Sequence, residues 1–346
     1  MKEKEKEKEK EKKRLRTRFK MITLIIFLLS IFTWTHQVYA ATFFVEHFED
    51  NSFASRGWYD NPRGTIDAAN AKVGTGAFLC SMPVGSAGCS GGAPARHLFT
   101  PTNSIYVSFW VKYSANYIGT GTNSGPHEFY IITTRESNFE GLSYNYLDFY
   151  IQQTVGTDGG GVPAIQIQDG KMIDITKIGT NLIGVTENRA VAGCNGVGNT
   201  GGVSVNGVFG GSNCFRMDTP NPGDYWNQYL WLANGSYFKA QQGPYYKNDW
   251  HFIEVFAQLN TISNGIGQND GIVKYWYDGN LLINVNNAIM RTGASPTMQF
   301  NQFVIGPYLG NGSTVNQSMW IDELTVASDR PNTNPPPAPP QNLQVK

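Results

Sequence analysis

The sequence predicts an all-β protein, an antiparallel β-sandwich with long glycine-rich loops. Residues 41–346 hold all 38 glycines and 40 of the 45 aromatic residues, but only 38 of these 306 residues are charged. Many aromatic and few charged side chains exclude intrinsic disorder. Short apolar runs separated by turn residues, without a long 3.6-residue period, are typical of strands. Two packed sheets are the most economical way to bury so many strands.

The first forty residues are predicted to be a secretory signal peptide, with an uncleaved membrane anchor as the alternative. Residues 2–20 begin with a Lys-Glu repeat, which can form a helix, and end strongly basic. The apolar run 21–34 is short for spanning a bilayer. Val38-Tyr39-Ala40 then has the small-residue ending of a signal-peptidase site. We therefore expect a secreted or cell-surface protein with no membrane association after cleavage.

Removal of this segment changes the charge of the chain. The remaining residues comprise 16 basic and 22 acidic ones, a net charge of −6, although the whole chain is neutral. A nucleic-acid binder needs a basic surface to displace counterions from phosphates. We therefore expect no nucleic-acid partner.

Strand-like runs follow one another along the predicted domain, 41–328. The clearest run, 105–112, places apolar side chains on one side and a mixed set on the other. Asp278-Gly279-Asn280 lies between two such runs and predicts a hairpin, because Gly readily adopts the positive φ of tight turns. The other runs are 128–133, 146–152, 164–168, 252–259, 272–277, 281–285, 302–306 and 319–327.

Two stretches between these runs are predicted to be long loops. Residues 156–161 and 192–213 are rich in Gly, Asn and Ser, and loops on a rigid β scaffold are often where binding occurs. Residues 329–346 begin as a stiff polyproline linker. Their last part, 340–345, looks like the opening strand of a fibronectin type III module.

Four cysteines follow the predicted signal peptide. Their spacing favours two local disulfides, Cys80 with Cys89 and Cys194 with Cys214, although four cysteines allow three connectivities. Metal binding is the weaker alternative, because the sequence has no C-x-x-C motif or Cys/His cluster.

The last third of the predicted domain carries a series of motifs. A Trp opens the run Asp249-Trp250-His251-Phe252, and Leu259-Asn260-Thr261 forms a corner. A D-G-x-x-x-x-W-x-D-G hairpin follows at 270–279, and 303–306 and 320–324 supply the closing strands. This series resembles the late strands of concanavalin A-like jelly-roll domains, most closely those of secreted polysaccharide lyases and lyase-like proteins. The resemblance implies a jelly-roll sandwich with an extracellular polysaccharide as its partner.

Three earlier fragments occur in the order seen in alginate-lyase-like jelly rolls. They are the polar-lined strand 127–136, Gln166-Ile167-Gln168 and Tyr237-Phe238-Lys239-Ala240. The family's middle motif ends in His where this chain has Gln168, and its Arg-rich first motif is absent, with only Arg135 nearby. The resemblance implies cleavage of an acidic glycan by β-elimination.

β-Elimination requires a polar group that neutralises the sugar carboxylate, a base for the C5 proton and an acid for the leaving oxygen. Amide and cationic side chains suit the first role, whereas His and Tyr suit the others. The expected catalytic residues are His127, Gln166, Tyr237 and Lys239. The expected substrate-binding residues are Arg135, Gln168, Tyr245, Tyr246, Lys274 and Trp276.

These candidates also have structural readings. His127 fits a loop-edge residue bonded to the backbone, Lys239 an ordinary solvated lysine, and Trp276 a residue of sheet packing. The missing His and the linker toward a further module favour an alternative function. On that alternative the chain is a non-catalytic carbohydrate-binding or cell-surface adhesive module.

No cofactor is expected for the chemistry, but a structural Ca²⁺ is. The resemblance implies one ion between the first and last strands, with Glu46, Asp50 and Asp322 as oxygen ligands. A solvated strand edge is the alternative reading of these acids. Two other enzyme classes lack support, because the chain has neither the E-x-D-x-E strand of laminarinase-type hydrolases nor H-E-x-x-H.

Overall fold

A computed structural model of the chain forms two compact units, Met1–Tyr39 and Ala40–Lys346. The residues it describes are 2, 4–10, 12–16, 40–62, 65–90, 95–119, 130–134, 147–155, 160–169, 204–205, 208–209, 227–291, 293, 295–307, 309 and 312–331.

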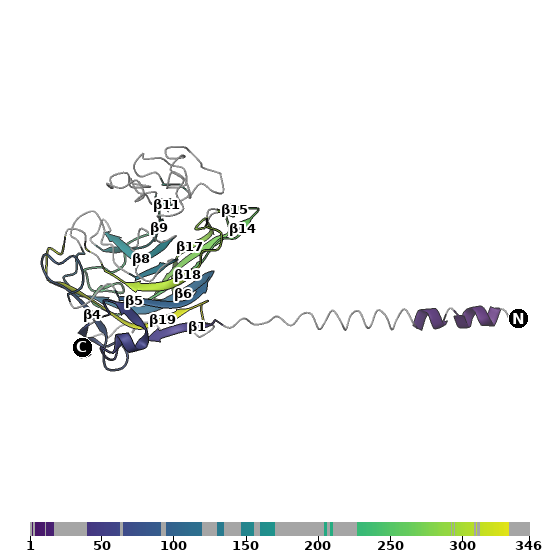
Figure 1. The fold of residues 1–346 in the computed structure, drawn as a ribbon, viewed down its shortest axis with the longest axis horizontal. Coiled ribbons are helices and arrows are strands. Elements are labelled where there is room, and N and C mark those ends of the chain that lie inside the picture. Colours follow the sequence, from purple (N-terminus) through teal and green to yellow (C-terminus); the bar gives the residue numbers. More distant parts are fainter. Residues whose placement is uncertain are drawn as a thin grey trace. The chain divides into compact units, whose positions relative to one another are not determined.

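The described part of the first unit is helical at residues 4–10 and 12–16, drawn in purple in Figure 1. Residues 4–10 belong to the Lys-Glu repeat, in which residues three apart carry opposite charges and so favour a helix. Among the described residues, no helix combines the length and apolar character needed to cross a membrane. The apolar run 21–34 lies outside them, so the signal peptide stays a prediction.

The second unit contains two large antiparallel sheets, which lie as facing layers in Figure 1. In the first sheet, β1 pairs with β19 beside the main strand order β17-β16-β13-β6-β19-β4-β3. The bounds of its strands are β1 Thr42–Glu46, β3 Thr65–Ile66, β4 Phe78–Met82, β6 Ser104–Tyr113, β13 His251–Gln258, β16 Gly271–Tyr277, β17 Asn280–Ala288 and β19 Gln317–Ala327.

The second sheet has the strand order β10-β11-β12-β9-β8-β7-β18-β5-β2. Its strands are β2 Trp58–Asp60, β5 Ala95–Thr102, β7 Tyr130–Thr133, β8 Asp148–Val155, β9 Gly161–Asp169, β10 Ser204–Val205, β11 Val208–Phe209, β12 Asn227–Leu232 and β18 Phe300–Ile305. The remaining described elements are the short pair β14 Ile262–Ser263 and β15 Ile266–Gly267, and the 3-10 helices η1 Phe53–Arg56 and η2 Ala68–Asn70.

The core lies between the two sheets and is filled largely by alternate side chains of the long strands. Val107 and Phe109 of β6 point into it from the first sheet, as the pattern of run 105–112 predicts. Phe149 and Ile151 of β8 point into it from the second sheet. The predicted antiparallel β-sandwich of the jelly-roll type is therefore confirmed.

The turn between β16 and β17 confirms the predicted hairpin. Asp278 and Gly279 have φ angles of 47° and 78°, and a type I′ hairpin turn requires positive φ at both central residues. The Asp278 carboxylate also accepts the backbone N–H of Phe252 at 2.7 Å, which ties the turn to β13.

The Leu-Asn-Thr corner after β13 is held by one buried amide. The Oδ1 atom of Asn260 accepts the backbone N–H groups of Met290 and Arg291, at 2.8 and 2.7 Å. Its Nδ2 atom donates to the Arg291 carbonyl at 2.7 Å, and the residue is fully buried. Asn260 thus joins the end of β13 to the chain that follows β17.

The predicted disulfide between Cys80 and Cys89 is present. It joins β4 to the loop that follows, and Cys80 packs in the core. Cys194 and Cys214 lie outside the described residues.

Replacing both Cys80 and Cys89 with Ala is expected to lower the free energy of unfolding by about 2–3 kcal/mol. The cross-link closes a loop of sequence separation 9 and so restricts the unfolded chain. Urea unfolding of the oxidised wild type and the variant measures the difference. Equal unfolding midpoints would contradict the prediction.

Candidate functional site

The second sheet carries a row of polar residues on the face turned away from the core, here called the outer face. In β8, Phe149 and Ile151 point into the core, so Asp148, Tyr150 and Gln152 have the opposite direction. In β9, Ile165 and Ile167 fill the core, so Gln166 lies on the outer face too. These polar residues are nevertheless buried.

Gln152 and Gln166 form an amide pair on this face. Tyr150 lies directly opposite Gln166, and Gln152 Nε2 donates to Gln166 Oε1 at 2.6 Å. The Gln152 oxygen is buried without a hydrogen-bond donor among the described residues. A buried acceptor without a donor is costly, so a hydroxyl or N–H group that reached this atom would gain a hydrogen bond there.

Tyr150 stands next to the amide pair as a protonated phenol. Burial raises its pKa well above 10, and the charge of Asp148 raises it further. Because ionisation is so disfavoured, the phenol keeps its proton through neutral pH. Such a group suits donation of a proton to a leaving oxygen better than removal of a proton from carbon.

Arg96 of β5 brings a positive charge to the same face. Its Nε atom donates to Asp60 Oδ2 at 2.8 Å, and its Nη1 atom donates to Gln302 Oε1 at 3.1 Å. The register of β5, β18, β7 and β8 places Arg96 and Tyr150 in one row. Three strand spacings of about 4.8 Å separate them by roughly 14 Å.

Five residues of this face are absent from the predicted site: Arg96, Asp148, Tyr150, Gln152 and Gln302. The alternation of run 146–152 predicts that Tyr150 and Gln152 lie on the same face as the charged Asp148. Arg96 and Gln302 have no comparable local signal, because they join the row only through long-range pairing.

Tyr237 and Lys239 do not lie beside Gln166, although one groove was expected to hold all three. Tyr237 exchanges two backbone hydrogen bonds with Gly161, at 2.9 and 2.7 Å. Gly161 is five residues before Gln166 along β9, which corresponds to roughly 16 Å. His127 and Arg135 lie outside the described residues, as does the side chain of Gln168.

Tyr237, Lys239 and Tyr245 instead meet at the end of the sandwich where β9 begins, and we call them the rim cluster. The rings of Tyr237 and Tyr245 are 4.8 Å apart, and Lys239 Nζ is 6.0 Å from the Tyr245 ring. The Lys239 N–H donates to the Tyr245 carbonyl at 2.6 Å. The three side chains are only partly buried, and burial raises the pKa of Tyr237.

His251 holds the backbone beside this cluster. Its Nδ1 and Nε2 atoms lie 2.8 Å from Asp278 Oδ2 and from the Tyr246 carbonyl. The ring also stacks on Tyr277, with centroids 4.8 Å apart, and is buried. Both nitrogens are thus engaged in joining the loop at Tyr246 to the β16–β17 hairpin, which is a structural role.

Lys274 and Trp276 belong to the first sheet, on the face away from the core. The Arg330 guanidinium lies 4.7 Å from the Trp276 ring and donates from Nε and Nη2 to Glu254, at 2.8 and 2.9 Å. Trp276 is therefore covered and lies on a different sheet from Gln166. The residues expected to bind substrate do not share one surface.

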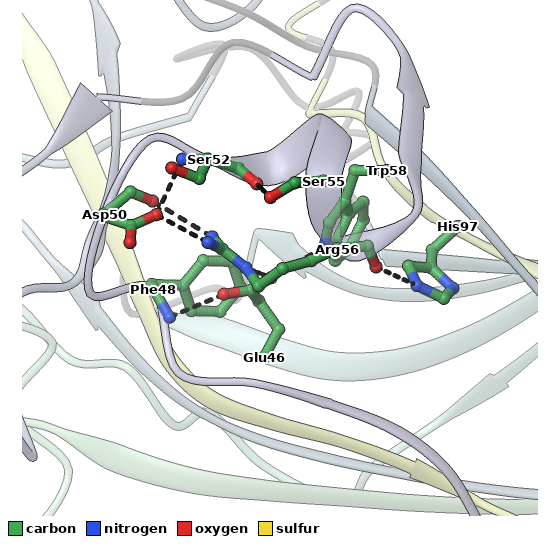
Figure 2. Close-up of polar contacts among 8 residues, drawn as sticks. All are labelled: Glu46, Phe48, Asp50, Ser52, Ser55, Arg56, Trp58 and His97. Carbon is green, nitrogen blue, oxygen red and sulfur yellow. Dashed lines mark hydrogen bonds and ion pairs between the residues drawn. The ribbon is translucent and has the colours of Figure 1, made fainter.

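The acids expected to bind Ca²⁺ are engaged by N–H donors, as Figure 2 shows for Glu46 and Asp50. Arg56 lies between these two, donating from Nε to Glu46 Oε2 at 2.8 Å and from Nη1 to Asp50 Oδ1 at 2.6 Å. Hydrogen bonding to Arg56 lowers the pKa of Asp50. Asp322 accepts the backbone N–H of Lys72 at 2.8 Å, and burial raises its pKa.

This arrangement does not fit a bound Ca²⁺, because Arg56 already supplies the positive charge beside Glu46 and Asp50. Within the described part of the chain, no three His, Cys, Asp or Glu side chains are grouped as metal ligands. Calcium therefore stays a prediction that these side-chain contacts do not favour.

His97, also drawn in Figure 2, is expected to make stability depend on pH. Burial lowers its pKa, although contacts with the Arg56 and Leu98 carbonyls act in the opposite direction. The unfolded chain, with a His pKa of about 6.5, then binds the proton more readily than the folded one. Unfolding free energy should therefore fall as the pH drops below about 6.5 toward the folded pKa.

Urea unfolding at about pH 8 and about pH 5, for wild type and a His97→Gln variant, checks this prediction. The variant should lose that part of the pH dependence. Identical dependence in both proteins would show that His97 does not cause it.

No protein-family model and no curated protein matches the chain. Similar solved structures include an alginate lyase from Aplysia kurodai, with 14% identity and a TM-score of 0.48 over 84% of this chain and 100% of that one. An alginate lyase from Chlorella virus has 13% identity and a TM-score of 0.46, over 84% of this chain and 99% of that one. A glucuronan lyase from Trichoderma reesei has 12% identity and a TM-score of 0.46, over 83% of this chain and 96% of that one.

Proposed function

We propose that this chain is a secreted protein that binds an acidic polysaccharide along the outer face and cleaves it by β-elimination. The observation that carries the proposal is the amide pair, where the Gln152 oxygen is buried without a donor and Tyr150 stands beside it. Buried polar groups are normally satisfied, so this face is built to receive a polar ligand.

The residues of the outer face match the chemistry of the proposed reaction. Amide N–H groups of this face neutralise the uronate carboxylate, which makes the C5 proton more acidic. A base removes that proton, the C4–O bond breaks and a C4=C5 double bond forms. Tyr150 gives its proton to the leaving oxygen. His127, one of the expected catalytic residues, is the candidate base.

Product formation tests the proposal. The purified chain would be incubated with alginate, glucuronan, pectate and heparin-like polymers, and ultraviolet absorbance of unsaturated chain ends would be followed. At least one polymer should give such ends in proportion to enzyme concentration. No absorbance change with any of the four would contradict a lyase.

A second candidate function is glycan binding without cleavage. It is favoured by the described histidines, none of which is placed to act as the base. His251 and His97 are committed to the contacts above, and His47 contacts Glu323 at 2.9 Å. Retention on an immobilised polymer without unsaturated products would support this second function.

A further inference from the structure

Gln153 carries a second buried amide oxygen without a donor. The residue is 5% exposed, and its Oε1 atom has no hydrogen-bond partner within the part of the chain that the structure describes. It follows Gln152 in β8, so the two side chains point to opposite faces of the sheet. Gln153 is therefore separate from the amide pair.

The Gln153 carboxamide lies over Gly161, at the start of β9. A Cβ atom on Gly161 would be 1.6 Å from Gln153 Oε1, so only glycine leaves room for the carboxamide in this position. Gly161 is also the backbone partner of Tyr237. Gly161 and Tyr237 are directly opposed and antiparallel, so their side-chain positions project to the same face. Because the Gln153 oxygen occupies the side-chain position of Gly161, it lies on the side of the Tyr237 ring.

An unsatisfied amide oxygen at this position is not explained by stability. A buried acceptor without a donor weakens a fold, and an apolar side chain of similar shape would avoid the loss. The neighbouring rim cluster offers what a sugar needs for binding. Tyr237 and Tyr245 present two rings at 63°, and Lys239 brings an ammonium group for a carboxylate.

We propose that the rim cluster and Gln153 form a second sugar subsite, in which the Gln153 oxygen accepts a hydroxyl of a bound uronic-acid residue. The subsite rests on the proposed function, since it holds another residue of the same polymer. It lies roughly 16 Å along β9 from Gln166 and on the other face of the sheet, at the end of the sandwich. A disaccharide at the amide pair does not reach it, whereas a longer oligomer that passes round this end of the sheet occupies both.

Titration calorimetry with alginate and glucuronan oligomers of increasing length tests the subsite, using the full chain. Gln153→Leu should bind disaccharides as wild type does but lose about tenfold in affinity for long oligomers, the value of one good hydrogen bond. Gly161→Ala, which displaces the carboxamide, should give the same pattern. The matched control Gln166→Leu should weaken binding at every length.

Thermal unfolding separates this role from a structural one. A ligand-binding Gln153 predicts that Gln153→Leu keeps or raises Tm, because a buried orphan acceptor is removed. A lower Tm would mean that Gln153 supports the fold through a bound water, and would overturn the subsite. Wild-type affinity for long oligomers in Gln153→Leu would also overturn it and leave the proposed function intact. Absence of binding by the wild type would refute both.

Discussion

A Tyr150→Phe variant is expected to cleave the substrate polymer about 10²–10⁴-fold more slowly than wild type, the usual range for loss of a positioned proton donor. Burial keeps the Tyr150 phenol protonated, and the residue lies opposite Gln166 beside the donor-free Gln152 oxygen. Phe keeps the ring and its packing against Val304 but has no proton to give. Initial rates of unsaturated-end formation measure the effect, and polymer affinity should change little.

Tyr106→Phe is the matched control. Tyr106 is also buried, and its pKa is also raised by burial, but it donates to Glu254 on the first sheet, at 2.8 Å. Its loss should leave the cleavage rate nearly unchanged. A Tyr150→Phe protein that cleaves as fast as this control would remove Tyr150 from the proposed mechanism.

Asn260→Ala is expected to lower the free energy of unfolding by about 3 kcal/mol or more. The substitution removes four side-chain hydrogen bonds, of which the three shorter ones are worth about 1 kcal/mol each, and leaves two buried backbone N–H groups without acceptors. The backbone carbonyl of residue 260, which accepts from the Arg291 guanidinium at 2.7 Å, is kept in the variant. Urea unfolding measures the change.

Asn287→Ala provides the control for Asn260→Ala. Asn287 is exposed on β17, so its replacement should change stability by less than about 0.5 kcal/mol. A similar decrease in the free energy of unfolding in both variants would show that the side chain of Asn260 does not stabilise this fold specifically.

Much of the fold was predictable because its signals are local. The alternation of run 105–112 anticipates β6, and Asp278-Gly279 anticipates a turn with two positive φ angles. The Cys80–Cys89 disulfide closes a short loop, so spacing alone suggested it. In each case, the residues that decide the outcome are near one another in the chain.

The candidate site was predictable only in part. Gln166 does lie on a polar face, but Tyr237 and Lys239 belong to the rim cluster, and Trp276 is covered by Arg330 on the other sheet. The order of the motifs along the chain does not say how far apart they lie in the fold. Gly161 and Gln166 are five residues apart on β9, and this separation places the rim cluster and Gln166 at different sites.

The sequence by itself determined which side of each strand is apolar, because side chains alternate with a period of two. Only the tertiary structure decided which strands became neighbours. Arg96 and Gln302 meet although they are 206 positions apart, and Arg56 folds back to occupy the place between Glu46 and Asp50. Strand pairing and loop return are set by the packing of the whole sandwich, and no local pattern encodes them.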